Sequence, residues 1–517
     1  MGFMGLSKFG HKDSVNDFTD VLVPMADAKR HPDVVAEYQR RISKEGARPD
    51  AADVTGANDE KKDGPLSDTE GGFPRTSSGT YSPYTVEGLK AEIHEDVSTS
   101  EHNTAYDLKS KVINKAIQDI GMGRYNWQLF ILCGFGWFAD NLWLQGLCLG
   151  ASFWGIGSDI MGRRLAFNCT LFIAGVFGIA AGAAPSWVGV CGLFAALGFG
   201  VGGNLPVDGA LFLEFLPNAS GGLLTLLSVW WPVGQLVASL IAWGFLGTSY
   251  PIDEGWRYFV YTMGAMTFVM FLSRFLLFHL YESPKFLLSR GRQAEAVAVV
   301  HGMAYKNKTT TWLTEDILNE IGGHPEKTEG STLTTAEIIK RKLGAFSGDR
   351  IGPLFHDRKL GMTTGLLWFC WATIGMGYPL FNAFLPQYLA RGTTAGGETV
   401  SASITYRNYA ITSVVGVPGS ILACYTVDVK YIGRKGTMAI STMLAGVFLF
   451  LFTLSADSDY QLAFSSVEAF FQNIMYGVLY AYTPEVFPAP VRGTVIDEFM
   501  HEIQLELLAN VLDMTVE

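Results

Sequence analysis

Two carboxylates lie in stretches of the sequence that are otherwise apolar. Asp140 lies within residues 127–157, and Asp208 follows Asn204 in the segment GGNLPVDGALFLEF. An ionisable side chain in hydrocarbon is costly and usually faces a cavity with a function. Because burial favours the neutral carboxyl group, each acid is a candidate proton carrier. The alternatives are a structural hydrogen-bonding group at Asp140 and a polar contact between helices at Asp208.

Further polar side chains in apolar stretches are candidates for binding a solute. A polyol or another polar solute needs hydrogen-bond donors and acceptors beside aromatic faces. Taken singly, each of these side chains more commonly joins two helices. Arg274 lies near the boundary of its apolar stretch, so we expect its charged end to extend to that boundary. The candidates are Gln235, Asn382, Gln387, Gln472, Asn473, Tyr378, Tyr476 and Tyr480, with Glu468 as a further buried acid.

Two charged motifs occur twice in the chain. The offsets between the two copies are 269 and 271 residues. Near-equal offsets indicate duplicated halves, which is how many secondary transporters are built. The first motif is Asp159-x-x-Gly162-Arg163-Arg164 with its counterpart Asp428-x-x-x-x-Gly433-Arg434-Lys435, and the second is Glu214 with Pro217 and its counterpart Glu485 with Pro488.

These motifs and candidate sites require membrane helices to position them. The 517 residues are 49% hydrophobic and only 17% charged, against about 25% charged in ordinary soluble proteins. A bilayer core about 30 Å thick needs roughly 20 apolar residues per helix. Eight segments meet this requirement: 165–184, 188–212, 223–247, 257–280, 361–389, 406–427, 437–455 and 461–482.

The polar segments divide the chain into five parts. Residues 1–120 are rich in Ser, Thr, Asp, Glu, Gly and Pro, so we expect a mostly disordered cytoplasmic tail, with 84–120 as the place for a short amphipathic helix. An N-terminal membrane half over 121–281, a cytoplasmic loop over 282–359 and a C-terminal membrane half over 360–494 follow. The fifth part is a tail over 495–517. The basic loops fall on one side if each segment crosses once, which places that side and the N-terminus in the cytoplasm.

The repeat also measures the length of each half. In the second half 68 residues separate Leu360 from Asp428, which is room for two helices, whereas 31 residues separate Gln128 from Asp159. A helix of that length reaches roughly 46 Å, enough for one tilted span and not for two. We therefore expect the first and second helices to be fused, with the start of one joined to the end of the next.

The end of the chain indicates a similar gap. Residues 495–517 carry six acidic residues, no Lys or Arg, and no 20-residue apolar run. We expect an acidic tail outside the membrane and no eleventh or twelfth helix. Our interpretation is a missing internal exon and an altered 3′ end, with a genuine short isoform as the alternative.

At its motifs the chain resembles the major facilitator superfamily, in its sugar-porter-like and synaptic-vesicle-glycoprotein-like branches. The resemblance covers about residues 121–494 and rests on GIGSDIMGRR, GFGVGGNLPVDGALFLEFLP, YESPKFLLSRGR, VGVPGSILACYTVD and PEVFPAPVRGT. It implies an all-α polytopic membrane protein of two pseudo-symmetric six-helix halves that works by alternating access. Asp140 matches an acidic position in the first helix of this branch.

The resemblance also implies a role for the repeated motifs. In the family such charged networks stabilise one access state, so breaking them shifts the conformational equilibrium. The alternative is a topology signal alone, which needs only the positive charges. The gating candidates are Asp159, Gly162, Arg163, Arg164, Glu214, Glu282, Asp428, Gly433, Arg434, Lys435, Glu485 and Arg492.

The functional expectation is a secondary transporter of a small polar or organic solute, sugar-like or an organic ion, coupled to protons through Asp140 or Asp208. We expect a multi-pass plasma-membrane protein, monomeric, and not an enzyme. No cofactor or metal is predicted, because the six cysteines lie in apolar stretches without a C-x-x-C pair. The net charge of −11 argues against nucleic acid as a partner. A non-transporting membrane sensor and an inactive truncated form are the alternatives.

Overall fold

The computed structural model describes twelve stretches of the chain, and the named elements within them are helices. The described residues are 14–18, 20–28, 85–90, 105–143, 148–217, 222–247, 251–324, 358–391, 401–427, 429, 432–454 and 457–486. The acidic segment 495–517, and with it the expected lack of an eleventh and a twelfth helix, lies outside these residues.

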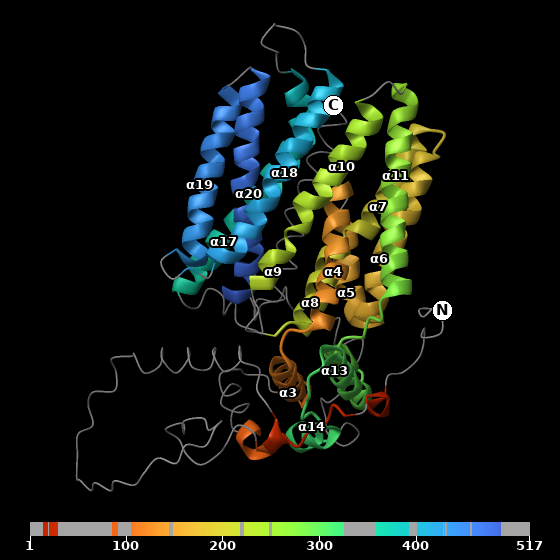
Figure 1. Ribbon diagram of the computed structural model, residues 1–517, viewed down its shortest axis with the longest axis vertical. Coiled ribbons are helices and arrows are strands. Elements are labelled where there is room, and N and C mark those ends of the chain that lie inside the picture. The colour runs from red at the N-terminus through yellow and green to blue at the C-terminus, as the bar shows by residue number, and fades with distance from the viewer. Residues whose placement is uncertain are drawn as a thin grey trace, which may run out of the picture.

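Long helices form two groups that stand side by side (Figure 1). The N-terminal group consists of α4 (Arg124–Trp143), α5 (Cys148–Met161), α6 (Arg163–Gly182), α7 (Trp187–Val201), α8 (Asn204–Phe215), α9 (Gly222–Leu227), α10 (Trp230–Leu246) and α11 (Ile252–Leu272), which the π-helical turn η6 (Ser273–Leu277) continues. The C-terminal group consists of α17 (Arg358–Arg391), α18 (Ala402–Thr426), α19 (Gly433–Leu454) and α20 (Ser458–Val486).

Each of the eight predicted apolar segments corresponds to one helix or to a pair of consecutive helices. Within the described residues, five stretches are long and apolar enough to cross a membrane: Arg163–Gly182, Leu223–Leu246, Glu254–Leu276, Ala402–Thr426 and Gly433–Leu454. Large apolar side chains such as Phe369, Met443 and Phe450 are more than 60% exposed on the outer faces of α17 and α19. That outward apolar surface suits lipid rather than water.

The predicted segment 188–212 is broken where glycines interrupt it. Helix α7 ends at Val201 and α8 begins at Asn204, with Gly202 and Gly203 between them. A side chain at Gly203 would collide with the ring of Trp154, so the neighbouring helix α5 approaches closely only because the position is glycine. Beyond the break, Asn204 and Asp208 are fully buried in the interior.

The expectation that the first and second helices are fused is not confirmed, because the described residues of this stretch form two helices, α4 and α5. Both contact the same end of the bundle: Asn307 accepts the backbone N–H of Tyr125 near the start of α4, and Arg290 donates to the carbonyl of Ile160 near the end of α5. The chain therefore reverses direction within this stretch. Residues 144–147, which join the two helices, lie outside the described part.

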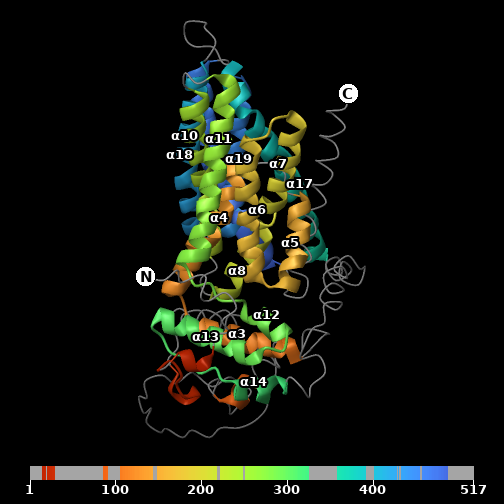
Figure 2. The same cartoon turned by 90° about the vertical axis from the view of Figure 1, so that its right-hand side faces the viewer.

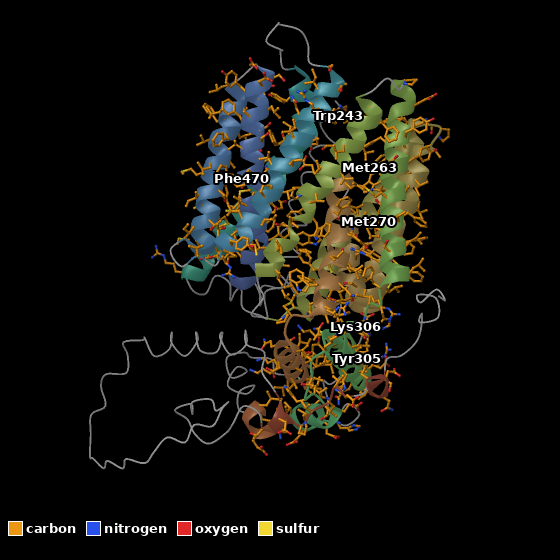
Figure 3. The ribbon with its side chains drawn as sticks, viewed as in Figure 1. Trp243, Met263, Met270, Tyr305, Lys306 and Phe470 are labelled. Atoms are coloured by element: carbon orange, nitrogen blue, oxygen red, sulfur yellow. The ribbon has the colours of Figure 1, made fainter. Side chains whose placement is uncertain are left out.

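Four short helices lie beyond one end of the N-terminal group, and we call them the basal layer (Figure 2). They are α3 (Ala105–Ile120), α12 (Pro284–Ser289), α13 (Gln293–Asn307) and α14 (Glu315–Gly322). Local sequence signals start two of them, because the hydroxyl groups of Ser283 and Thr314 accept backbone N–H groups of α12 and α14, and Pro284 occupies the first turn of α12. Lys306 and Tyr305 of α13 lie in this layer (Figure 3).

The segment 1–120, expected to be mostly disordered, contributes packed structure in two places. Helix α3 buries Val112 and Ile113 completely, and the Trp312 indole donates to Asp119 at 2.8 Å. Farther upstream, Leu22 forms a parallel bridge with Thr311: the backbone N–H of Thr311 donates to the carbonyl of Val21 at 2.9 Å, and the N–H of Val23 donates to the carbonyl of Thr311 at 3.1 Å. These residues bury apolar surface against α13 and α14, which offsets the entropy cost of ordering them.

Contact between the two halves runs along α10 and α18, which lie side by side in Figure 1. Trp243 of α10 donates its indole N–H to Ser403 at 2.9 Å, near the end of the bundle away from the basal layer (Figure 3). Closer to the middle, Gln235 donates to the hydroxyl of Tyr409 at 2.7 Å. The halves therefore meet through polar contacts as well as apolar packing.

Candidate functional site

The structure brings three of the predicted site residues together in the middle of the N-terminal half. Asn204 and Asp208 are one turn apart on α8, and they face Gly136 and Asp140, one turn apart on α4. The amide nitrogen of Asn204 lies 3.2 Å from Oδ1 of Asp140 and 3.5 Å from the carbonyl of Gly136. We call Asp140, Asn204, Asp208 and Arg274 the central cluster.

Arg274 completes this cluster, and our expectation that its charged end extends to the membrane boundary is wrong. Its side chain is fully buried, and Nη2 lies 2.5 Å from Oδ2 of Asp208. Nε and Nη1 donate to the carbonyls of Leu132 and Phe167, each at 2.9 Å, and the guanidinium lies over the Phe167 ring. The buried guanidinium is stabilised by the carboxylate of Asp208 and by two backbone carbonyls, so the side chain does not need to reach water at the boundary.

Three acceptor oxygens in the central cluster are buried and have no partner in the described part of the chain. They are Oδ2 of Asp140, Oδ1 of Asn204 and Oδ1 of Asp208. Buried polar atoms are usually hydrogen-bonded, and each exception needs an explanation. With both carboxylates ionised, the cluster carries one negative charge in excess of Arg274. It therefore has the capacity to hold a proton.

Aromatic side chains from both halves form a second group at the interface between them. Trp137 stacks on Trp231 with ring centroids 4.6 Å apart, and Tyr480 lies 4.8 Å from Trp231. Trp371 packs edge-on against Tyr480 at 4.7 Å, and Tyr476 lies 4.9 Å from Trp231. Of the predicted solute-binding residues, Tyr476 and Tyr480 belong to this group, and Gln235 lies one turn beyond Trp231 on α10.

The remaining solute-binding candidates lie on α17 and α20 rather than on the helices of the central cluster. Glu468 is 3% exposed, and its Oε2 has no partner among the described residues. Asn473 donates to the carbonyl of Ala469 on its own helix, and Gln472 lies beside it. Asn382, Gln387 and Tyr378 belong to α17, but their side chains lie outside the described part.

The first copy of the charged motif forms a network at the end of the N-terminal half next to the basal layer. Arg163 lies 3.0 Å from both Asp159 and Glu214. Glu282 Oε1 accepts the backbone N–H groups of Arg163 and Arg164 at 2.9 and 3.2 Å. Burial raises the pKa of the Glu282 carboxyl, and these N–H groups oppose that rise. The network links α5, α6 and α8 to the basal layer.

The second copy of the motif is only partly described. Gly433 and Gly162 both have a positive φ, 57° and 106°, at the first residue of α19 and immediately before α6, so the two copies share a backbone feature that favours glycine. Arg434 is partly buried and Lys435 is exposed at the start of α19. Asp428, Arg492 and the side chain of Glu485 lie outside the described residues, so the second network stays a prediction.

Sequence reasoning missed Arg274, Gly136 and the tryptophans of the aromatic group. A signal for Arg274 was present, since it is the one charged residue between 258 and 280, in a stretch long enough to span a bilayer. Gly136 could not be singled out, because its importance comes from the neighbouring helix: any side chain there would collide with Asp208. The tryptophans lie in apolar segments where aromatic residues are common.

Apolar helices in two groups, with buried charges inside and apolar side chains outside, define a multi-pass helical membrane protein. Residues 123–497 match the family model described as Major Facilitator Superfamily, so the chain belongs to this superfamily. The predicted resemblance and all-α fold are confirmed. The superfamily comprises transporters of small molecules, which are not enzymes.

Comparison with known proteins agrees with this assignment. The chain is 45% identical to a protein named MFS siderochrome iron transporter 1 of Ceriporiopsis subvermispora, over 75% of this chain and 81% of that protein. It is 40% identical to an uncharacterized MFS-type transporter of Schizosaccharomyces pombe, over 83% of this chain and 88% of that one. A crystal structure of a double-tryptophan XylE mutant shares the fold, with a TM-score of 0.52, 17% identity, and coverage of 74% and 87%.

Proposed function

We propose that this chain is a secondary active transporter that couples a small polar or organic solute to a proton bound at the central cluster. The observation that carries the proposal is the buried set of Asp140, Asn204 and Asp208, with three unpartnered acceptor oxygens and one excess negative charge. Such a site favours uptake of a proton, because two carboxylates held close together in a low-dielectric interior repel each other. Neutralising the cluster changes the relative energies of the access states.

The solute site lies, in this proposal, at the interface between the halves beside the aromatic group. Gln235, Tyr409 and Ser239 of α10 and α18 supply polar groups there, and Trp231, Tyr476 and Tyr480 supply aromatic faces. The arrangement suits a small polar or organic molecule. The similarity to a protein named siderochrome iron transporter supports testing ferric siderochromes beside sugars and organic ions.

We further propose that the Arg163 network stabilises one access state. Asp159, Glu214 and Glu282 all interact with groups of Arg163 at the same end of the bundle, so separating α8 from α5 would break charged contacts. The basic side chains at this end, with Arg290 and Arg292 of the basal layer, support a cytoplasmic location for that layer. The plasma membrane and a monomeric state are further parts of the proposal.

Uptake by the purified full chain in phosphatidylcholine vesicles tests the transport proposal. A panel of ferric siderochrome, D-xylose, nicotinate and choline is offered with and without an inward proton gradient. We expect accumulation of at least one solute under the gradient, and loss of that accumulation in Asp140→Asn. Glu254→Gln, an exposed acid at the start of α11, is the matched control. Gradient-independent uptake, or unchanged accumulation in Asp140→Asn, overturns the proton coupling; no accumulation of any panel member favours a non-transporting role.

Orientation is tested separately by cysteine labelling in a cysteine-free background. Tyr305 in the basal layer is 55% exposed, and Trp187 at the opposite end of the bundle is 76% exposed. In intact cells a membrane-impermeant maleimide should modify Trp187→Cys and spare Tyr305→Cys until the membrane is permeabilised. The reverse pattern would place the basal layer outside the cytoplasm.

A further inference from the structure

We infer that Arg274 is a positioning residue: it holds Asp208 as a fixed anion and leaves Asp140 as the carboxyl of the central cluster that exchanges a proton. The inference deepens the proposed function and rests on it, because it assigns the proton to one of two candidate acids. It also gives a role to Arg274, for which the sequence predicts a place at the membrane boundary rather than in a site.

The contacts of Arg274 fix both its place and its charge. Each of its three described hydrogen bonds goes to a different helix: Leu132 on α4, Phe167 on α6 and Asp208 on α8. An arginine side chain does not lose its proton under protein conditions. Protonating Asp208 would therefore leave a buried positive charge without its partner, which is strongly unfavourable. Asp208 stays ionised for as long as Arg274 faces it.

Local backbone features hold the pair in this place. Arg274 lies in η6, where the α-helix α11 gives way to a single π-helical turn. Such turns change the direction in which side chains leave a helix and are frequent at functional sites. Gly136 lets Asp208 approach α4, because a side chain at that position would collide with Oδ2 of Asp208 and crowd the Arg274 guanidinium.

Asp140 has a different environment from Asp208. Its described partner is the neutral amide of Asn204, and no described cation lies within ion-pair distance of it. Among the residues that the structure describes, neither Oδ2 of Asp140 nor Oδ1 of Asn204 has a donor. Binding one proton converts the Asp140 carboxylate to an acid with an O–H donor, and the amide oxygen of Asn204 can accept it. A single proton therefore satisfies acceptors that ionised Asp140 leaves unpaired.

Few other titratable groups face the cluster from the elements packed around it. Cys133 on α4 lies near Asp208 and Arg274. The charged residues of α5, α6 and α11 in the described part lie at the ends of those helices, as Asp159, Arg163 and Glu254 show, and α10 carries none. The division of roles between the two carboxyls thus depends on Arg274 and Asn204.

Infrared difference spectroscopy on the full chain in phosphatidylcholine vesicles tests the assignment without any solute. The carbonyl band of a protonated carboxyl group is followed while the pH is stepped, in a Glu468→Gln/Glu282→Gln background because those two acids are also shielded from water. We expect a band that is lost in Asp140→Asn and kept in the double variant Asp208→Asn/Arg274→Gln. Arg274→Gln alone should gain a second carboxyl band, because Asp208 then becomes neutral.

Two results would overturn the inference. One is a titrating band that survives Asp140→Asn and vanishes in Asp208→Asn/Arg274→Gln, which would assign the proton to Asp208. The other is an Arg274→Gln spectrum identical to that of the parent. Arg274→Lys keeps the charge and should keep the parental single band, so it serves if Arg274→Gln does not fold. The infrared experiment involves no solute. A failure of uptake would therefore contradict the transport proposal and leave the assignment of the proton to Asp140 to be decided by the spectra.

Discussion

The two halves of the molecule each bury an acid, and they hold it by different means. In the N-terminal half Asp208 faces Arg274 at 2.5 Å, with both side chains fully buried. In the C-terminal half Glu468 on α20 is 3% exposed, and no ion pair to it occurs among the described residues. The halves thus repeat the motifs Gly162-Arg163 and Gly433-Arg434 but do not repeat the chemistry of their interiors.

Neutral polar groups line the C-terminal half where the N-terminal half has an ion pair. Thr412 and Ser465 lie 3.4 Å apart across α18 and α20, and Asn408 contacts Ser458 at 3.5 Å. Asn408 and Thr412 are four positions apart on α18, and Ser458 and Ser465 are seven positions apart on α20, so each pair lies on one face of its helix. Hydrogen bonds between membrane helices are worth about 0.6 kcal/mol on average, far less than a buried ion pair costs to break. The difference indicates a rigid N-terminal interior and a more adaptable C-terminal one.

Removing the charge of Arg274 tests whether the N-terminal interior is rigid, and it has the largest expected effect on the free energy of unfolding. Arg274→Leu leaves Asp208 as an unpaired buried acid and should lower the free energy of unfolding by about 3–5 kcal/mol. Thermal unfolding in detergent, followed by tryptophan fluorescence, measures this loss. The double variant Arg274→Leu/Asp208→Leu removes both charges and should recover most of it. Equal losses in the single and double variants would show that the pair does not act as a unit.

Periodicity and composition were enough to predict the helices, because long apolar runs must satisfy their backbone within the segment. They also identified Asp140, Asn204 and Asp208, since isolated polar residues in such runs need a partner. The break at Gly202 was less accessible, because it depends on how closely the neighbouring helix α5 approaches Gly203. Packing of residues 14–28 on α13 was missed, because a polar composition conceals the few apolar residues, such as Val21, that dock.

Arg274 shows why a site cannot be completed from sequence alone. Its distance from the predicted boundary favoured a charged end at the membrane surface, whereas its three partners come from helices that are 66 to 142 residues away in the chain. Such partners follow from the tertiary arrangement, and a single sequence does not contain it. Glu468 was predicted as a buried acid, but the lack of a described counter-charge could be seen only in the structure.

Neutralising Glu468 tests the adaptable side of the comparison and should have the opposite sign. Glu468→Gln keeps the size of the side chain and removes a buried carboxyl group that no described cation balances. We expect the free energy of unfolding to rise by about 1–2 kcal/mol, the cost of an unsatisfied buried polar group. Asp208→Asn is the matched comparison and should lower the free energy of unfolding, because it leaves the buried Arg274 without its counter-charge. A destabilised Glu468→Gln would show that Glu468 has a partner outside the described residues.

Acid should weaken the N-terminal half through the basal layer, which packs against α4 in the described part. Burial lowers the pKa of His301 below its usual 6.5, so the folded state binds its proton less readily than the unfolded chain does. The stability that neutral His301 provides is present above about pH 6.5 and is lost as pH falls through the lowered pKa, by at most about 1.4 kcal/mol per pH unit.

The comparison of parent and His301→Gln isolates this contribution. Glu282 acts in the opposite direction: burial raises its pKa, so its contribution is largest at low pH and declines as pH rises through the raised value. Both proteins contain Glu282, so its effect cancels. The glutamine can still donate to the carbonyl of Leu313, which His301 contacts at 2.7 Å. Unfolding temperatures measured between pH 7.5 and 5 should fall less steeply in His301→Gln; parallel slopes would contradict the prediction.

The smallest expected effect comes from a single hydroxyl in the C-terminal half. Thr412→Val keeps the shape of the side chain and removes the contact to Ser465, so it should cost about 0.6 kcal/mol of unfolding free energy. Its matched partner in the N-terminal half is Thr170→Val, since Thr170 is fully buried on α6 and bonds only the carbonyl of Phe167 on its own helix in the described part. If the C-terminal interior is adaptable, Thr412→Val combined with Ser465→Ala should cost no more than the sum of the two single changes. A cost well above that sum would mean that the hydroxyl row is as cooperative as the Asp208–Arg274 pair, and the contrast between the halves would be lost.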